Sequence, residues 1–136
     1  TPVPGLDRLF PGPTQLAAAS ADELGQLGIT RQRQRALIGL AQLFGEGRLL
    51  LQPGADVPRT VAQLQSIPGI GDWTAQYIAM RALAWPDAFP SGDVALQRAL
   101  KLRAAAQPAP AALAASERWR PWRSYATVRA WATLES

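Results

Sequence analysis

A tight glycine-containing turn between two helical segments is the feature that most restricts how this chain can fold. It lies in IPGIGDWTA (67–75), where Gly69 and Gly71 stand two positions apart. Such a turn needs positive φ angles or a close backbone approach, and glycine allows both at little steric cost. The next helix begins at once, so its first N–H groups point outward and can receive an anion. The segment predicts a helical hairpin that binds DNA phosphate without reading base sequence, although the same pattern also occurs in simple connecting turns.

Capping patterns and helical periodicity predict an all-α fold around this turn. Two capping boxes, in which Ser or Thr pairs with Glu or Gln three residues later, begin helices at Ser20–Glu23 and Thr60–Gln63. Three further helix N-caps are expected at Thr30, Asp72 and Asp93. Pro121 is expected in the first turn of a last helix, with Tyr125, Val128 and Trp131 on one face. No stretch alternates apolar and polar residues as a half-buried strand does.

The expected elements are short and are separated by proline and glycine. Loops are expected at 49–58 and 85–92, and a break at Pro108 and Pro110 precedes a short alanine-rich helix. The expected helices end at Leu27, Gly45, Ile67, Ala84 and Leu100, in chain order.

The amino-acid composition restricts the possible chemistry of the protein more than it restricts the possible fold. The 136 residues suffice for one compact domain, and no segment is long and apolar enough to cross a membrane, so a cytoplasmic protein is expected. The chain has no cysteine and no histidine. Disulfides, iron–sulfur clusters and Cys or His catalysis are therefore excluded. The net charge of +4, with Lys101 as the only lysine, suits an anionic partner but gives a weak field.

Asp93 is the candidate catalytic carboxylate. It lies in FPSGDVALQRAL (89–100), between a loop and a helix that begins at Val94. By itself this setting is that of an ordinary helix N-cap. The two roles are compatible, because a carboxylate at a helix N-terminus stays ionised. Cleavage of an N-glycosidic bond builds positive charge on the sugar, and a fixed anion lowers that barrier.

The segment LQSIPGIGDWTA (64–75) resembles the hairpin of the helix-hairpin-helix DNA glycosylase superfamily, and Asp93 follows it at the spacing of the superfamily's essential aspartate. WRPWRSYATVRAW (119–131) and LGITRQRQRALIGLA (27–41) extend the resemblance, over nearly the whole chain, to the bacterial 3-methyladenine DNA glycosylase II family. It implies a multi-helix glycosylase fold truncated at its N-terminal side. Residues 1–136 would form the C-terminal part of the catalytic domain, with the hairpin at about 60–84 and the catalytic loop and last helices at 85–136.

The resemblance also implies an activity, which is base-excision repair of alkylated purines such as 3-methyladenine in duplex DNA, leaving an abasic site. Bifunctional members carry a Schiff-base lysine where this chain has Trp73, so a monofunctional enzyme is implied. The implied base-binding pocket consists of Trp73, Tyr77 and Trp131, whose electron-rich rings attract a cationic base. The implied phosphate contacts come from Gly69, Gly71, Trp73 and Thr74. The implied ligands of a structural Na⁺ or K⁺ are the backbone carbonyls of Gln65, Ile67 and Ile70; no cofactor is expected for catalysis.

The chain departs from the family at its beginning. It starts at Thr1 rather than at a methionine, and nothing in it matches the family's N-terminal β-containing domain or its wedge-bearing helices. We therefore expect a piece of a longer bacterial, nucleoid-associated protein, which needs the remainder of that parent as a partner and shows little activity alone. Two alternatives stay open: a non-catalytic helix-hairpin-helix DNA-binding module, and a helical interaction protein with no nucleic-acid role.

Overall fold

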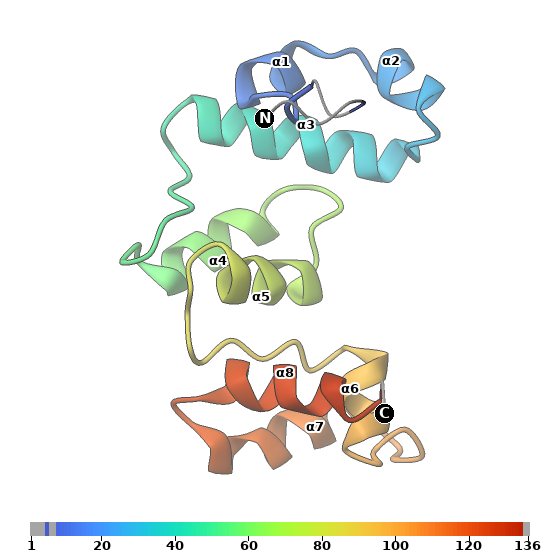
Figure 1. The fold of residues 1–136 in the computed structure, drawn as a ribbon, viewed down its shortest axis with the longest axis vertical. Coiled ribbons are helices and arrows are strands. Elements are labelled where there is room, and N and C mark those ends of the chain that lie inside the picture. Colours follow the sequence, from blue (N-terminus) through green and yellow to red (C-terminus); the bar gives the residue numbers. More distant parts are fainter. Residues whose placement is uncertain (1–4, 6–7, 135–136) are drawn as a thin grey trace. The chain divides into compact units, whose positions relative to one another are not determined.

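The structure is a computed structural model that describes residue 5 and residues 8–134; Thr1 lies outside the described residues. Within them the chain is helical and contains no strand, so the predicted all-α class is confirmed (Figure 1). The helices, in chain order, are α1 (Pro13–Ala18), α2 (Ala21–Gln26), α3 (Arg31–Gly45), α4 (Val57–Gln65), α5 (Asp72–Arg81), α6 (Val94–Ala99), α7 (Pro108–Ser116), the short 3₁₀-helix η1 (Glu117–Trp119) and α8 (Arg123–Ala132). Among the described residues, no helix has the length and apolar character that crossing a bilayer requires.

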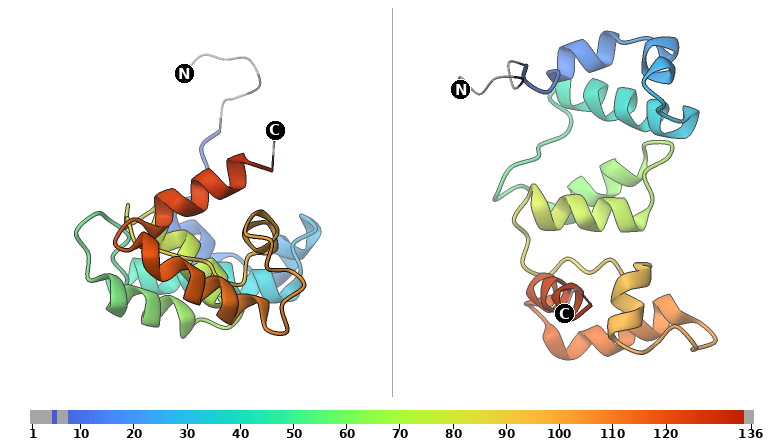
Figure 2. Two further views of the ribbon diagram at one scale, coloured as in Figure 1. Left: turned by 90° about the horizontal axis from the view of Figure 1, so that it is seen from below. Right: turned by 45° about the vertical axis from the view of Figure 1, so that its right-hand side comes forward.

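The chain divides into two compact units. The first comprises Thr1–Leu49 with Ile67–Gly69, and the second comprises Leu50–Ser66 with Ile70–Ser136. In the first unit, α1 and α2 both pack against α3, the long helix that Figure 2 shows beneath them. The predicted capping box of α2 is present, since Ser20 Oγ accepts from Glu23 N at 3.2 Å and a Glu23 carboxylate oxygen accepts from Ser20 N at 2.8 Å.

Two apolar clusters form the core of the second unit. One consists of buried residues of α5 and the loop after it, packed against partly buried side chains of α4, α5 and α8; its buried members are Ala79, Met80, Leu83 and Ala88. The other joins the loop before α6 to α6 and α7; its buried members are Phe89, Leu96 and Ala112. Trp131 of α8 packs against both clusters, so one side chain links the α4–α5 pair to the C-terminal helices.

The start of α4 differs from the sequence-based expectation. The helix begins at Val57, three residues before the predicted capping box, so the predicted loop 49–58 is two residues too long. Asp56 is the N-cap and accepts from Arg59 N at 3.1 Å, while the Thr60 hydroxyl donates to Asp56 O at 2.8 Å inside the helix. Pro58 lies in the first turn, where the N–H that proline lacks has no helical partner. The start of α4 is therefore set by the aspartate cap with its first-turn proline, and not by the Thr–Gln capping box.

The last helix also differs from the prediction. It begins at Arg123 rather than at Pro121, which precedes it. Tyr125 and Val128 are exposed (66% and 44%), so they do not share a buried face with Trp131. The buried residues of α8 are instead Arg123, Ser124 and Thr127. The apolar periodicity misleads here because polar side chains occupy the inward face: Arg123 and Ser124 bond to the loop 85–92, and Thr127 donates to Arg123 O within the helix.

Smaller differences concern helix ends and short elements. Helix α5 is capped by Gly71 and spans Asp72–Arg81, so Asp72 is its first residue rather than its cap and it ends before Ala84. Helix α7 begins at Pro108 itself. The sequence analysis did not predict α1 or η1, which are six and three residues long.

The two hairpin glycines differ in what they require. Gly69 has a φ of +97°, and a Cβ there would lie 3.0 Å from the backbone oxygen of Gln32. Gly71 has a φ of −92° and a ψ of −178°, which is extended backbone, and a Cβ there would meet no atom within 4 Å. A positive φ is therefore found at Gly69 and not at Gly71. At Gly71, what glycine provides is open space beside the backbone.

This difference predicts unequal stability effects for two matched substitutions. Gly69→Ala should lower the free energy of unfolding by about 1–2 kcal/mol, because a left-handed conformation is costly for a residue with a Cβ. Gly71→Ala should change it by no more than about 0.5 kcal/mol, because the extended conformation is open to all residues. Urea denaturation of both variants measures the contrast. Equal losses would mean that the hairpin turn differs from the one described.

Candidate active site

The hairpin leaves the first turn of α5 open to a ligand. Gly71 caps the helix without a side-chain bond, and the first bond into the helix is from Ala75 N to Gly71 O at 3.0 Å. In the described part of the chain, no acceptor is bonded to the backbone N–H groups of Asp72, Trp73 or Thr74. These are three of the donors that every helix start leaves without a helical partner. The Asp72 carboxylate, which accepts from Gln65 Nε2 at 3.2 Å, adds a negative charge beside them.

Asp93 accepts hydrogen bonds from three separate elements. Its Oδ1 accepts from Leu96 N at 2.6 Å, which makes it the N-cap of α6 as predicted. The same oxygen accepts from the indole Nε1 of Trp131 on α8 at 3.0 Å. Its Oδ2 accepts from the indole Nε1 of Trp73 on α5 at 2.8 Å. The two indoles lie 20 and 38 residues away in the sequence, so the tertiary fold, and not local structure, completes this site.

These donors determine the charge state of the carboxyl group. Burial on its own would raise the pKa of Asp93, because a less polar surrounding disfavours the charged form. The N–H of Leu96, the indoles of Trp131 and Trp73, and the N–H of Ala95 act in the opposite direction and outweigh burial. The pKa of Asp93 therefore lies below the usual value of an aspartic acid, and the group is ionised at neutral pH.

Aromatic side chains surround this carboxylate. The Trp73 and Tyr77 rings are stacked, with centroids 5.3 Å apart and an interplanar angle of 8°. The Tyr77 and Trp131 rings are tilted at 44°, with centroids 6.2 Å apart. The structure thus brings together the three predicted pocket residues and Asp93. Trp73 is 42% exposed, so part of its ring is accessible to a ligand.

Two features of the site were missed by the sequence analysis. The guanidinium of Arg81 lies 5.7 Å from the centre of the Tyr77 ring. Its position one helical turn after Tyr77 is a signal that could have been used, since residues four apart share a helix face. The bonds from the two indole N–H groups to Asp93 had no such signal, because they depend on how α5 and α8 each pack at the start of α6.

The other predicted contact residues belong to the hairpin turn. The carbonyls of Gln65 and Ile70 belong to the second unit and that of Ile67 to the first. No backbone N–H of the described residues is bonded to any of the three. The Na⁺ or K⁺ site at these three carbonyls therefore stays a prediction.

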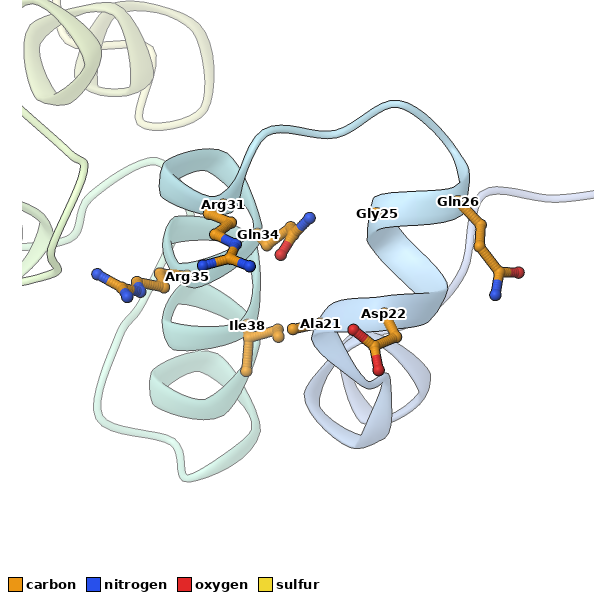
Figure 3. Close-up of a pocket in the computed structure, with 8 residues that line it drawn as sticks. All are labelled: Ala21, Asp22, Gly25, Gln26, Arg31, Gln34, Arg35 and Ile38. Atoms are coloured by element: carbon orange, nitrogen blue, oxygen red, sulfur yellow. The ribbon is translucent and has the colours of Figure 1, made fainter.

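A separate hollow of about 750 Å³ lies between α2 and α3 in the first unit (Figure 3). Asp22 of α2 and Arg31 and Arg35 of α3 contribute its charged side chains. The buried amide of Gln34 is already bonded there, since its Nε2 donates to Ile29 O at 2.6 Å. The hollow includes none of the predicted site residues, and its size alone does not indicate a function. Asp93 and the aromatic rings beside it therefore remain the candidate site.

The fold that carries Asp93 is similar to the folds of proteins whose structures have been solved. A 3-methyladenine DNA glycosylase of Schizosaccharomyces pombe (Mag1), solved with abasic DNA, matches 93% of this chain and 65% of its own with a TM-score of 0.74 at 20% identity. A DNA-3-methyladenine glycosidase of Bacillus halodurans matches 90% of this chain and 58% of its own with a TM-score of 0.72 at 28% identity. The fold is therefore the helix-hairpin-helix glycosylase fold.

Sequence comparison gives the family. The chain is 42% identical over 130 residues to the "probable bifunctional transcriptional activator/DNA repair enzyme AlkA" of Mycobacterium tuberculosis, covering 96% of this chain and 26% of the relative. It is 40% identical over 124 residues to DNA-3-methyladenine glycosylase 2 of Escherichia coli, covering 91% of this chain and 43% of the relative. No family model matches. The chain belongs to the 3-methyladenine DNA glycosylase family and corresponds to the C-terminal portion of these relatives, spanning less than half of their length.

The bond from Trp131 to Asp93 predicts a pH-dependent loss of stability. Trp131→Phe keeps an aromatic ring but removes the N–H donor, and should lower the free energy of unfolding by about 1–2 kcal/mol at pH 7. The folded-state pKa of Asp93 is depressed, so the contribution of its bonds is present above the unfolded pKa of about 3.9 and is lost as the pH falls through the lower folded value. The difference between variant and parent should therefore shrink in acid.

Urea denaturation at pH 7 and at pH 3 measures this effect. Trp122→Phe is the matched control, because Trp122 is 58% exposed and no hydrogen bond joins its indole to a carboxylate among the described residues. A Trp131→Phe loss that stayed constant with pH would be a packing effect and would contradict the hydrogen bond.

Proposed function

We propose that the protein carrying this chain is a monofunctional DNA glycosylase of base-excision repair, which hydrolyses the N-glycosidic bond of alkylated purines such as 3-methyladenine and leaves an abasic site. The observation that carries the proposal is the ionised Asp93 carboxylate, held by two indole N–H groups and a helix N-terminus beside exposed aromatic surface. The names of the relatives in the family give the same reaction.

Asp93 supplies the charge that this reaction needs. As the bond between base and sugar breaks, its electron pair leaves with the base and positive charge develops on the sugar ring. A fixed carboxylate stabilises that charge without having to reorganise. A carboxylate can accept about four hydrogen bonds. Asp93 accepts two on Oδ1 and one on Oδ2, and the N–H of Ala95 also acts on the carboxylate. The side of Oδ2 away from the Trp73 indole can orient a water, whose oxygen adds to the sugar carbon and whose proton passes through the carboxylate to solvent.

The aromatic residues suit a cationic leaving base. Trp73, Tyr77 and Trp131 present electron-rich faces, which attract a positive charge. Arg81 already stands over Tyr77, so the two indoles offer the more favourable surfaces for a cationic base. An alkylated purine that carries a positive charge departs as a neutral molecule and needs no general acid. This agrees with a site in which Asp93 is, among the described residues, the one carboxylate bonded to the aromatic side chains.

The proposed chemistry involves no covalent enzyme–sugar intermediate. The first turn of α5 carries Trp73 at the position where a Schiff-base lysine would stand, and Lys101 is the only lysine of the chain. The sugar carbon is therefore attacked by water, and the DNA strand is left intact at the abasic site.

DNA is the proposed partner of the hairpin. The backbone N–H groups of the turn and of the first turn of α5, at Gly69, Gly71, Trp73 and Thr74, would bind phosphate, with Na⁺ or K⁺ at the carbonyls of Gln65, Ile67 and Ile70. The open space beside Gly71 supports this proposal, because a phosphate can approach the backbone there. A structural relative was solved with abasic DNA. The part of the protein beyond this chain would complete the pocket.

The central experiment replaces Asp93 in the whole protein. Asp93→Asn should reduce single-turnover release of an alkylated base by at least about 100-fold, because the anion acts where charge develops in the transition state. Affinity for duplex DNA should stay within about twofold, since Asn keeps the shape of the side chain and much of the helix cap.

Asp56→Asn is the matched control. Asp56 is also a helix N-cap, accepting from Arg59 N at 3.1 Å, but has no indole donor. It should leave the rate unchanged. If Asp93→Asn kept the parent's rate, Asp93 would be no more than a cap. If the parent bound DNA but released no base, the protein would be a non-catalytic helix-hairpin-helix DNA-binding module.

A second experiment tests the hairpin. Gly71→Val should weaken binding to duplex DNA about tenfold or more at moderate salt, because its side chain fills the open space beside the backbone where phosphate approaches. Binding should be similar for methylated and unmodified duplexes and should weaken with salt, since the contacts go to phosphate. Fluorescence anisotropy measures both.

Gly12→Val is the control for this substitution. Gly12 is likewise an extended N-cap glycine, of α1, with a φ of −70° and a ψ of 166°. A Gly71→Val protein that was folded and bound DNA as tightly as the Gly12→Val protein would remove the hairpin from the DNA interface.

A further inference from the structure

A buried ion pair in the second unit has no part in the chemistry proposed above. It joins Asp87, in the loop 85–92 that leads to Asp93, to Arg123, the first residue of α8. The two residues are 7% and 5% exposed. Neither touches the aromatic rings in the ring contacts described above, so their role must be sought in what they hold in place.

The pair has a rigid, fork-like geometry. Arg123 Nε donates to Asp87 Oδ1 at 2.7 Å, and Arg123 Nη2 donates to Asp87 Oδ2 at 2.9 Å and to the Asp87 backbone oxygen at 2.9 Å. Arg120 adds a bond from Nη1 to Asp87 Oδ2 at 2.7 Å. Two parallel bonds from a planar guanidinium fix orientation as well as distance. Arg123 therefore holds both the side chain and the backbone of the loop.

The next residue of α8 fixes the same stretch of loop. Ser124 Oγ accepts from Ala88 N at 3.0 Å and lies 2.7 Å from the Trp85 carbonyl oxygen, to which it donates. Ser124 N donates to Pro86 O at 2.8 Å. Ser124 is 6% exposed. The start of α8 and the first half of the loop 85–92 thus form one polar joint inside the protein.

Two segments, the loop 85–92 and helix α8, connect this joint to the Asp93 site and together form a closed frame. From Asp87 the loop runs six residues to Asp93, and from Arg123 helix α8 runs eight residues, about two turns, to Trp131. The frame closes where Trp131 Nε1 donates to Asp93 Oδ1 at 3.0 Å. A change of angle at the joint is therefore carried along the rigid helix to the indole that holds the carboxylate.

We propose that Arg123 and Asp87 are positioning residues of the active site, which set the register of the loop 85–92 on α8 and thereby place the Trp131 indole against Asp93. The inference rests on the proposed glycosylase function. It concerns geometry rather than stability, because a buried ion pair replaced by apolar side chains of similar size often leaves stability unchanged. Such a replacement removes the two parallel hydrogen bonds by which Arg123 holds the loop 85–92.

The test uses two variants and one control. Asp87→Leu combined with Arg123→Met removes both charges together and leaves no unpaired buried ion, and Arg123→Lys keeps the charge but loses the fork. Glu117→Gln is the control, because it removes the exposed partner of Arg120 and Arg123 without touching the loop.

Two measurements are made on each folded variant. The first is the indole Nε1–H resonance of Trp131 in ¹⁵N NMR spectra of this chain, assigned with Trp131→Phe, which reports its bond to Asp93 without any activity. The second is single-turnover release of an alkylated base by the whole protein at saturating enzyme. In the double variant we expect the Trp131 resonance to move toward that of an indole without a charged acceptor. The rate should fall about 10- to 100-fold, with duplex affinity within about twofold.

Arg123→Lys should show an intermediate effect on both measurements, and Glu117→Gln should show none. A folded double variant that kept the parent's Trp131 resonance and rate would overturn the proposal and leave the pair a structural contact. If the parent released no base, the proposed function would fail, while an unchanged or shifted resonance would still decide whether the pair positions Trp131. If the double variant did not fold, Arg123→Lys would decide by the same two criteria.

Discussion

The hydrogen bonds that converge on the Asp93 carboxylate are the interaction on which the rest of the second unit depends. A partly buried charge is costly unless its oxygens are bonded, and here the donors come from the first turn of α6, from α5 through Trp73 and from α8 through Trp131. Each donor belongs to a different helix, so the carboxylate is satisfied only when the hairpin helix and the C-terminal helices are packed together. The apolar clusters agree with this, because Trp131 packs against both of them.

The parts of the site that could be predicted are those that depend on residues close together in the sequence. Asp93 as a helix cap, the glycine turn, and the placement of Trp73 and Tyr77 one turn apart on α5 all follow from short-range patterns. The role of Trp73, Tyr77 and Trp131 as pocket residues came from the family resemblance, and no local pattern connects Trp131 to Asp93. The indole bonds and the Asp87–Arg123 pair could not be predicted, because they join residues 20, 38 and 36 positions apart through packing of whole helices.

The errors in the fold have a common physical origin. On α8 the inward face carries Arg123, Ser124 and Thr127, so apolar periodicity selected Tyr125 and Val128, which are exposed. Arg123 and Ser124 can face inward because the loop 85–92 offers carbonyl, N–H and carboxylate partners, and Thr127 because it donates to Arg123 O. At α4 an aspartate N-cap with a first-turn proline was stronger than the capping box that followed it. In both cases the outcome depended on which hydrogen-bond partner was available.

The central claim is that the fold keeps Asp93 ionised between two indole N–H donors. A ¹³C NMR titration of the Asp93 carboxyl carbon, followed together with the indole ¹H–¹⁵N resonances of Trp73 and Trp131, tests it most directly. The structure predicts a pKa for Asp93 below the value of about 3.9 of a free aspartate and indole resonances that shift with the same midpoint. A midpoint at or above the free value, or indoles that do not respond when Asp93 titrates, would contradict the account.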